Sequence, residues 1–168
     1  MTLPITESQL VLEDGSVFEG EAIGYMPAGG IAVGEVVFNT TMTGYQEVIT
    51  DPSYAGQIIT FTTSHVGNYG TTNADDESRS AFARGVIVRD LARRRSNWRS
   101  TDDLDGLLTR NLLPGIAGLD TRRLTRILRD AGSLRGAFGT ADESTLRAAA
   151  LADSGTGGVD LVAQDRKS

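Results

Sequence analysis

Hydrophobic and polar positions divide the chain into a first half typical of strands and a second half with helical spacing. Near the start, two apolar segments flank Asp14 and Gly15, a pair that tolerates the positive φ of a hairpin turn. This pattern predicts a hairpin with strands over residues 9–13 and 16–22. Short runs rich in β-branched residues predict further buried strands at 36–38, 57–62 and 83–89.

In the second half, apolar residues recur at helical spacing between short buried runs. Ser100, with Asp103 three residues later, resembles a capping box and predicts a helix over about 101–110. A further helix is expected over 142–153. The runs LLPGIAGL and SLRGAFGT predict two more strands, at 112–119 and 133–140.

The clearest helix of the chain is predicted between Asp120, which can serve as its N-cap, and Gly132, which can end it. Leu124, Ile127 and Leu128 form its apolar face. The other face carries four arginines, Arg122, Arg123, Arg126 and Arg129. A solvated face is the commoner meaning of such a pattern, and docking of an acidic partner is the alternative.

These elements predict one α/β domain with mixed sheets and two to three helices, mainly in the second half. Its length of 168 residues suits a single domain of ordinary size. After residue 153 the chain becomes Gly-rich with scattered charge, which predicts a linker over 154–168. A linker suggests that a further domain normally follows, and a disordered tail is the alternative.

Composition narrows the possible chemistry. With Cys 0, the chain has no disulfide, thiolate nucleophile or Cys-ligated zinc, and His 1 leaves too few ligands for a transition-metal cluster. Since 16 basic and 22 acidic residues give a net charge of -6, a general nucleic-acid surface is not expected. No apolar run reaches the roughly 20 residues that span a bilayer, so we expect no membrane partner and a cytoplasmic location.

The stretch TDPSY presents a hydroxyl on a rigid turn, because Pro52 fixes its own φ and keeps Asp51 extended. Ser53 therefore either stabilises this turn or reaches a ligand, and the residues alone leave the two equal. Ser53, His65 and one of the acids Asp51, Asp75 or Asp76 supply the residue types of a hydrolytic triad. No G-x-S-x-G elbow supports that triad, and a lone His65 is more often structural.

Two charged segments are candidate binding sites. The acidic segment at 74–78 lacks the alternating ligands of an EF-hand, so no dedicated metal site is expected. Arg93, Arg94, Arg95 and Arg99 lie beside Trp98, as in a phosphate or nucleic-acid patch. In an acidic chain, a local contact surface is the preferred interpretation.

Longer motifs in the chain carry a resemblance. GEVVFNTTMTGYQEVITDPSYAGQI, HVGNYG, SNWR and GLDTRRLTRILRDAG, in this order, closely resemble the N-terminal domain of the small (glutaminase) subunit of carbamoyl-phosphate synthase. Ser64 stands where the family usually has Pro, Val66 replaces the usual Ile, and the chain after Asp142 is idiosyncratic. The resemblance implies the swivelling β/β/α fold and a domain over 1–153.

The resemblance also implies a function that depends on partners. The family's small subunit hydrolyses glutamine with a Cys, His and Glu triad in a C-terminal class I amidotransferase domain. Ammonia then passes to the large subunit, which uses bicarbonate, ATP and Mg to make carbamoyl phosphate for arginine and pyrimidine synthesis. No catalytic residue and no cofactor is therefore expected in this chain, which resembles the N-terminal domain alone.

For individual residues, the resemblance implies that Ser53 helps to bind L-glutamine across the boundary with the C-terminal domain. The implied partners are that domain, L-glutamine and the synthase large subunit. A freestanding interaction or regulatory domain with the same fold is the alternative, and an independent hydrolase is a third possibility. The coding sequence beyond Ser168 distinguishes the first two, because a nucleophile segment similar to CLGHQ would support the synthase.

Overall fold

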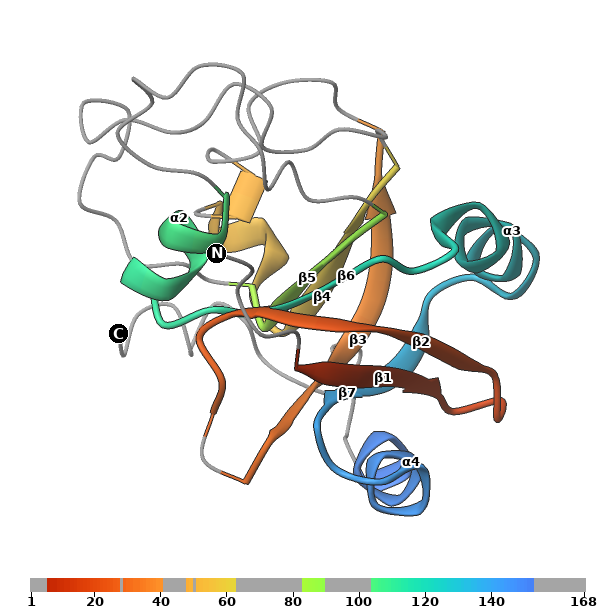
Figure 1. Ribbon diagram of the computed structural model, residues 1–168. Helices are drawn as coiled ribbons and strands as arrows, with labels where there is room; N and C mark the ends of the chain where they lie inside the picture. Colours follow the sequence, from red (N-terminus) through yellow and green to blue (C-terminus); the bar gives the residue numbers. More distant parts are fainter. Residues whose placement is uncertain are drawn as a thin grey trace.

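The computed structural model describes residues 6–27, 29–40, 48–49, 51–62, 83–89 and 104–152. Within these residues, the strands close into one barrel in the order β1-β2-β6-β5-β4-β3-β7 (Figure 1). The strands are β1 (Glu7–Leu12), β2 (Val17–Gly24), β3 (Ile31–Asn39), β4 (Gln57–Phe61), β5 (Gly85–Val88), β6 (Pro114–Ala117) and β7 (Leu134–Gly139). The expected mixture of strand directions is confirmed, and it is contained in a single closed sheet.

Three of the strands, β1, β2 and β7, form the antiparallel part of the barrel. The predicted hairpin is confirmed, since Leu10 of β1 pairs with Phe18 of β2. In its turn, Gly15 takes a φ of 93° and the Asp14 carboxylate accepts a hydrogen bond from the amide of Ser16 at 2.9 Å. Strand β7 pairs antiparallel with both β1 and β3, and this double pairing helps to close the sheet.

The strands β3, β4, β5 and β6 form the parallel part. Val36 pairs with Ile58, Ile59 with Val86, and Ile87 with Ile116. All the predicted strands are confirmed, although β3 begins at Ile31, well before the apolar run from which it was predicted. Because these strands run in one direction, their carboxyl ends lie at the same end of the barrel.

Three α-helices are described: α2 (Leu104–Arg110), α3 (Thr121–Ala131) and α4 (Glu143–Ala152). For α3 the predicted caps are confirmed, since the Asp120 carboxylate accepts a hydrogen bond from the amide of Arg123 at 3.0 Å and Gly132 has a φ of 78°. The predicted helix at 142–153 is α4. The predicted cap of α2, Ser100 with Asp103, lies outside the described residues.

Each helix covers a different part of the barrel. All the strands contribute buried residues to one apolar cluster, and Leu124 and Leu128 of α3 belong to it. Leu108 of α2 belongs to a second cluster with residues of β2, β4 and β5. Leu146 and Ala150 of α4 pack on Val11 and Ala137. The helices α3 and α4 lie on different sides of the barrel (Figure 1).

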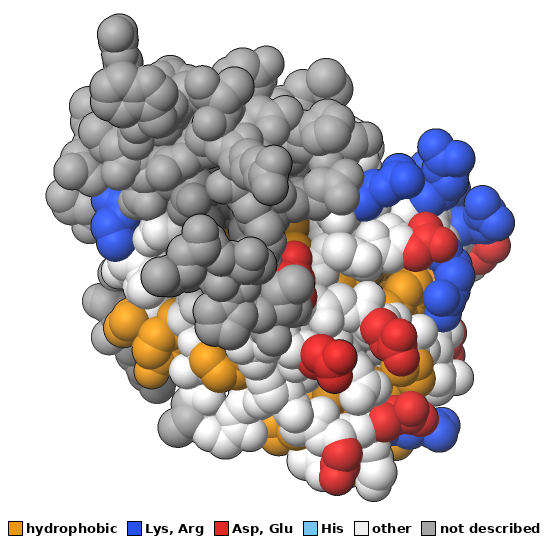
Figure 2. Space-filling view, in the orientation of Figure 1, with side chains coloured by type: hydrophobic (Ala, Val, Ile, Leu, Met, Phe, Trp, Pro, Cys, Tyr) orange, Lys and Arg blue, Asp and Glu red, His pale blue; other side chains and the backbone are white. Residues whose placement is uncertain are grey.

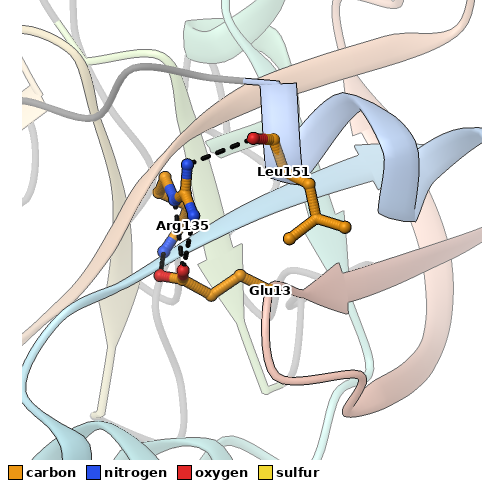
Figure 3. A network of polar contacts seen from close by, with 3 residues as sticks. All are labelled: Glu13, Arg135 and Leu151. Atoms are coloured by element: carbon orange, nitrogen blue, oxygen red, sulfur yellow. Dashed lines mark hydrogen bonds and ion pairs between the residues drawn. The ribbon is translucent and has the colours of Figure 1, made fainter.

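A charged network fastens the antiparallel part (Figure 3). The guanidinium of Arg135 on β7 donates to the Glu13 carboxylate, with distances of 2.8 and 3.1 Å, and to the carbonyl of Leu151 at 3.1 Å. The amide of Arg135 donates to the same carboxylate at 2.8 Å. These hydrogen bonds hold the pKa of Glu13 below its usual range, the side-chain bonds from Arg135 being the main cause.

Candidate functional site

The turn before β4 carries Ser53 and has a defined backbone structure. A 3₁₀ turn, η1 (Pro52–Tyr54), follows Asp51, which is extended at φ -79° and ψ 122°. The Asp51 carboxylate accepts from the amide of Ser53 at 2.9 Å. The amide of Tyr54 donates to the Asp51 carbonyl at 3.0 Å, and the amide of Ala55 donates to the Pro52 carbonyl at 3.1 Å. The turn predicted from the TDPSY stretch, with Asp51 extended before Pro52, is therefore confirmed.

Contacts with the barrel hold this turn in place. The Tyr54 hydroxyl accepts a hydrogen bond from the Asn39 side-chain amide at 2.8 Å, and its ring packs against the apolar cluster that includes Ile59. On the other side of the turn, the Gly56 carbonyl accepts from the amide of Glu35 at 3.2 Å. The turn is thus tied to β3 at two points, Tyr54 and Gly56, which closely follow Ser53 in the chain.

Ser53 itself is exposed at the tip of this turn. Its amide is used in the turn, whereas its hydroxyl makes no hydrogen bond to another residue in the part of the chain that the structure describes. The Asp51 carboxylate and backbone groups therefore hold the turn, and among the described residues the Ser53 hydroxyl takes no part in it. The role of Ser53 in binding glutamine stays a prediction.

The other components of the possible hydrolytic triad, His65, Asp75 and Asp76, lie outside the described residues, as do Trp98 and its neighbouring arginines. Asp51 engages the Ser53 amide, which is a structural role. Over the described ranges, no group of three or more His, Cys, Asp or Glu residues is placed to hold a metal ion. In the same ranges, no helix is long and apolar enough to cross a membrane.

The arginine face of α3 is not uniform. Arg123 donates to the carbonyl of Val17 at 3.0 Å and lies over the ring of Phe18, 4.0 Å from its centroid. This contact fastens α3 to the hairpin, a role that neither sequence interpretation included. Arg122, Arg126 and Arg129 are exposed, and Figure 2 shows Lys and Arg side chains gathered where Figure 1 places α3.

Three arginines of α3, Arg122, Arg126 and Arg129, border a cavity of about 360 Å³ at the carboxyl ends of the parallel strands. We call it the arginine cavity. Its lining consists of Thr40, Thr62, Arg89, Thr121, Arg122, Thr125, Arg126 and Arg129. Sequence reasoning missed Thr40, Thr62 and Arg89 as site residues. The available signal was their position directly after buried parallel strands, where ligand-binding residues often lie.

A family model and individual relatives in other organisms identify the same family for this chain. Residues 10–138 match the family described as the carbamoyl-phosphate synthase small chain, CPSase domain. The carbamoyl phosphate synthase small chain of Xylella fastidiosa (strain 9a5c) is 54% identical over 154 residues, which cover 90% of this chain and 40% of that relative. The small chain of Escherichia coli (strain K12) is 50% identical over 160 residues, covering 94% of this chain and 41% of that one.

Among solved structures, one match is the peptidase M28 precursor from Shewanella amazonensis SB2B. The matched region covers 81% of this chain and 35% of that one, with 10% identity and a TM-score of 0.40. That similarity is too low to support a conclusion. The chain spans about 40% of the length of the curated relatives that it matches. Since the family match extends from β1 to β7, the chain belongs to the carbamoyl-phosphate synthase small chain family and contains its CPSase domain.

Proposed function

We propose that this chain is the structural and docking domain of the glutamine-hydrolysing subunit of carbamoyl-phosphate synthase. In this role it supports a glutaminase domain, and the ammonia formed there supplies the large subunit for carbamoyl phosphate synthesis. The observation that carries the proposal is the family match over residues 10–138, which includes nearly the whole barrel. With Cys 0, the chain supplies no thiolate for a glutamyl thioester.

The proposed function also implies a domain arrangement, a partner and a location in the cell. Residues 1–153 form the domain, of the swivelling β/β/α type, and 154–168 lead toward a C-terminal class I amidotransferase domain. The large subunit is the partner that uses ATP and Mg. The protein works in the cytoplasm, in arginine and pyrimidine biosynthesis.

Ser53 contributes to this function by binding L-glutamine at the boundary with the glutaminase domain. Its exposed hydroxyl and the fixed backbone of η1 support this role, because a donor on a rigid turn loses little conformational freedom when a ligand binds. One such hydrogen bond contributes about 0.5 to 1.5 kcal/mol. It therefore affects glutamine affinity, and the chemistry remains with the other domain.

The test of this role is Ser53→Ala in the protein that carries both domains. We expect the KM for glutamine to rise about two- to tenfold with an unchanged kcat, since the lost bond acts in the ground state and the transition state alike. Ser144→Ala is the matched control, because Ser144 is exposed on α4. An unchanged KM in Ser53→Ala would contradict the role.

Docking is tested separately by light scattering after size exclusion, with the purified chain and a carbamoyl-phosphate synthase large chain over a salt series. A one-to-one complex that weakens with salt is expected if charged groups of this domain contribute to the interface. If no complex forms at micromolar concentration, this domain does not encode docking by itself. That result would favour a freestanding interaction domain or an assembly that depends on the glutaminase domain.

A further inference from the structure

The arginine cavity concentrates positive charge in a chain of net charge -6. Four guanidinium groups line it, and no Asp or Glu is present among its described lining residues. None of Arg89, Arg122, Arg126 and Arg129 makes an ion pair with another residue in the described part of the chain. Like charges that line one cavity repel one another, so an anion bound between them would relieve the repulsion.

A buried hydroxyl in the lining also lacks a partner. Thr125 is only 9% exposed, and its Oγ1 forms no hydrogen bond to a described residue. Buried polar atoms in proteins are nearly always hydrogen-bonded, and an exception requires an explanation such as a missing ligand. Thr62 differs, because its hydroxyl donates to the Asn39 carbonyl at 3.2 Å. Thr125 thus places a buried polar atom without a described partner beside the cavity, and Ser8, Glu35 and Thr60 carry such atoms elsewhere in the described residues.

The position of the cavity is that of a ligand site in α/β proteins. Thr40, Thr62 and Arg89 follow directly after β3, β4 and β5. The opposite wall is the helix α3, which lies against β3 and β4. Residues distant in sequence therefore meet at the carboxyl ends of parallel strands, where ligands commonly bind. Ser53 precedes β4 and the cavity follows it, so the two sites are separate.

The charge and size of the cavity indicate the class of ligand. Guanidinium groups bind phosphate and carboxylate in bidentate geometry, but a phosphate monoester carries close to two negative charges and a carboxylate only one. A volume of about 360 Å³ lies within the range of small-molecule pockets, roughly 300 to 1,000 Å³. We propose that the arginine cavity binds a small phosphorylated molecule, which the four lining arginines contact through their guanidinium groups.

Titration calorimetry of this chain tests the proposal with pyrophosphate as the probe and citrate as a carboxylate of similar charge. Pyrophosphate should bind at least tenfold more tightly than citrate, and its binding should weaken as salt is raised. In Arg126→Gln, the affinity for pyrophosphate should fall about tenfold, since one charge-assisted contact is lost. Arg147→Gln on α4 removes the same charge elsewhere and should leave the affinity within twofold.

Three results would overturn the proposal. One is the absence of pyrophosphate binding at millimolar concentration. Another is an equal loss of affinity in Arg126→Gln and Arg147→Gln, because the effect would then come from overall charge. The third is citrate binding as tightly as pyrophosphate, which would indicate a site for the acidic segment of a protein partner. Arg129→Gln provides a second exposed variant if Arg126→Gln does not fold.

Discussion

The antiparallel and parallel parts of the barrel differ in what occupies their ends. In the antiparallel part, β1 and β2 are joined by a tight turn, and Glu13, Arg135 and the end of α4 are bonded together at one end. In the parallel part, the carboxyl ends of neighbouring strands lie at the same end of the barrel. The Ser53 turn lies before β4, and the arginine cavity lies after β3, β4 and β5.

This difference follows from strand direction. An antiparallel pair can be connected by a short turn, as β1 and β2 are, and in this part Arg135 is paired with Glu13. Parallel strands need crossover connections, and these bring residues from distant parts of the chain to one end of the sheet. The antiparallel part is therefore expected to contribute mainly stability, and the parallel part to contribute binding surfaces.

The largest expected loss of stability follows a substitution in the antiparallel part, at Gly139 of β7. A Cβ at this position would lie 1.9 Å from the Gly30 carbonyl oxygen, and the φ of 150° is one that other residues rarely adopt. Gly139→Ala should lower the free energy of unfolding by about 3 kcal/mol or more, as measured by urea denaturation. Gly118→Ala, at the end of β6, is the control. Gly118 also has a positive φ, of 87°, but open space around it, so the cost should be only about 1 kcal/mol.

A smaller loss is expected when the charged network is removed. Arg135→Gln breaks the bonds to the Glu13 carboxylate and the Leu151 carbonyl, so the free energy of unfolding should fall by about 2 kcal/mol. Arg147→Gln, the same change at an exposed position of α4, should cost less than about 0.5 kcal/mol. Equal destabilisation by the two variants would show that the network adds no stability.

The same network makes the stability of the folded chain depend on pH. Because the pKa of Glu13 is lower in the folded chain than its usual value, the folded state favours the charged carboxylate. Its contribution is complete above the usual pKa of about 4.3 and is lost as the pH falls through the lower folded value. Glu13→Gln should thus be less stable than the unchanged chain by about 1 kcal/mol at pH 7. That difference should shrink at acid pH in thermal unfolding, and a difference independent of pH would contradict this account.

The smallest effect is expected in the parallel part, at the arginine cavity. Thr125→Val replaces a hydroxyl without a described partner by a methyl group, so the free energy of unfolding should stay level or rise by about 0.5 kcal/mol. Thr62→Val is the matched control, since it removes the bond to the Asn39 carbonyl and should cost about 1 kcal/mol. A clear loss of stability in Thr125→Val would mean that its hydroxyl is already paired within the protein.

Most local structure was predictable because its causes are local. Asp14 and Gly15 specify the hairpin turn, Asp120 and Gly132 specify the ends of α3, and Asp51 with Pro52 specifies η1. Each depends on side-chain and backbone groups within a few residues. The ordered motifs also led to the family, which the match over residues 10–138 confirms.

The candidate sites were predictable only in part. Ser53 could be identified as a candidate binding residue because one short stretch of sequence contains both its turn and its family motif. The arginine cavity could not, since its lining combines Thr40, Thr62 and Arg89 with α3, and only the pairing of β3, β4 and β5 brings them together.

By itself, the sequence determined most elements, the caps of α3, the turn at Ser53 and the family. The tertiary structure decided that the strands close into one barrel, that Arg123 fastens α3 to Phe18, and that the remaining arginines of α3 face the ends of the parallel strands. The physical reason is the distance along the chain over which each kind of interaction acts. Periodicity and capping act between near neighbours, whereas strand pairing and charge clustering depend on contacts between residues far apart in the chain.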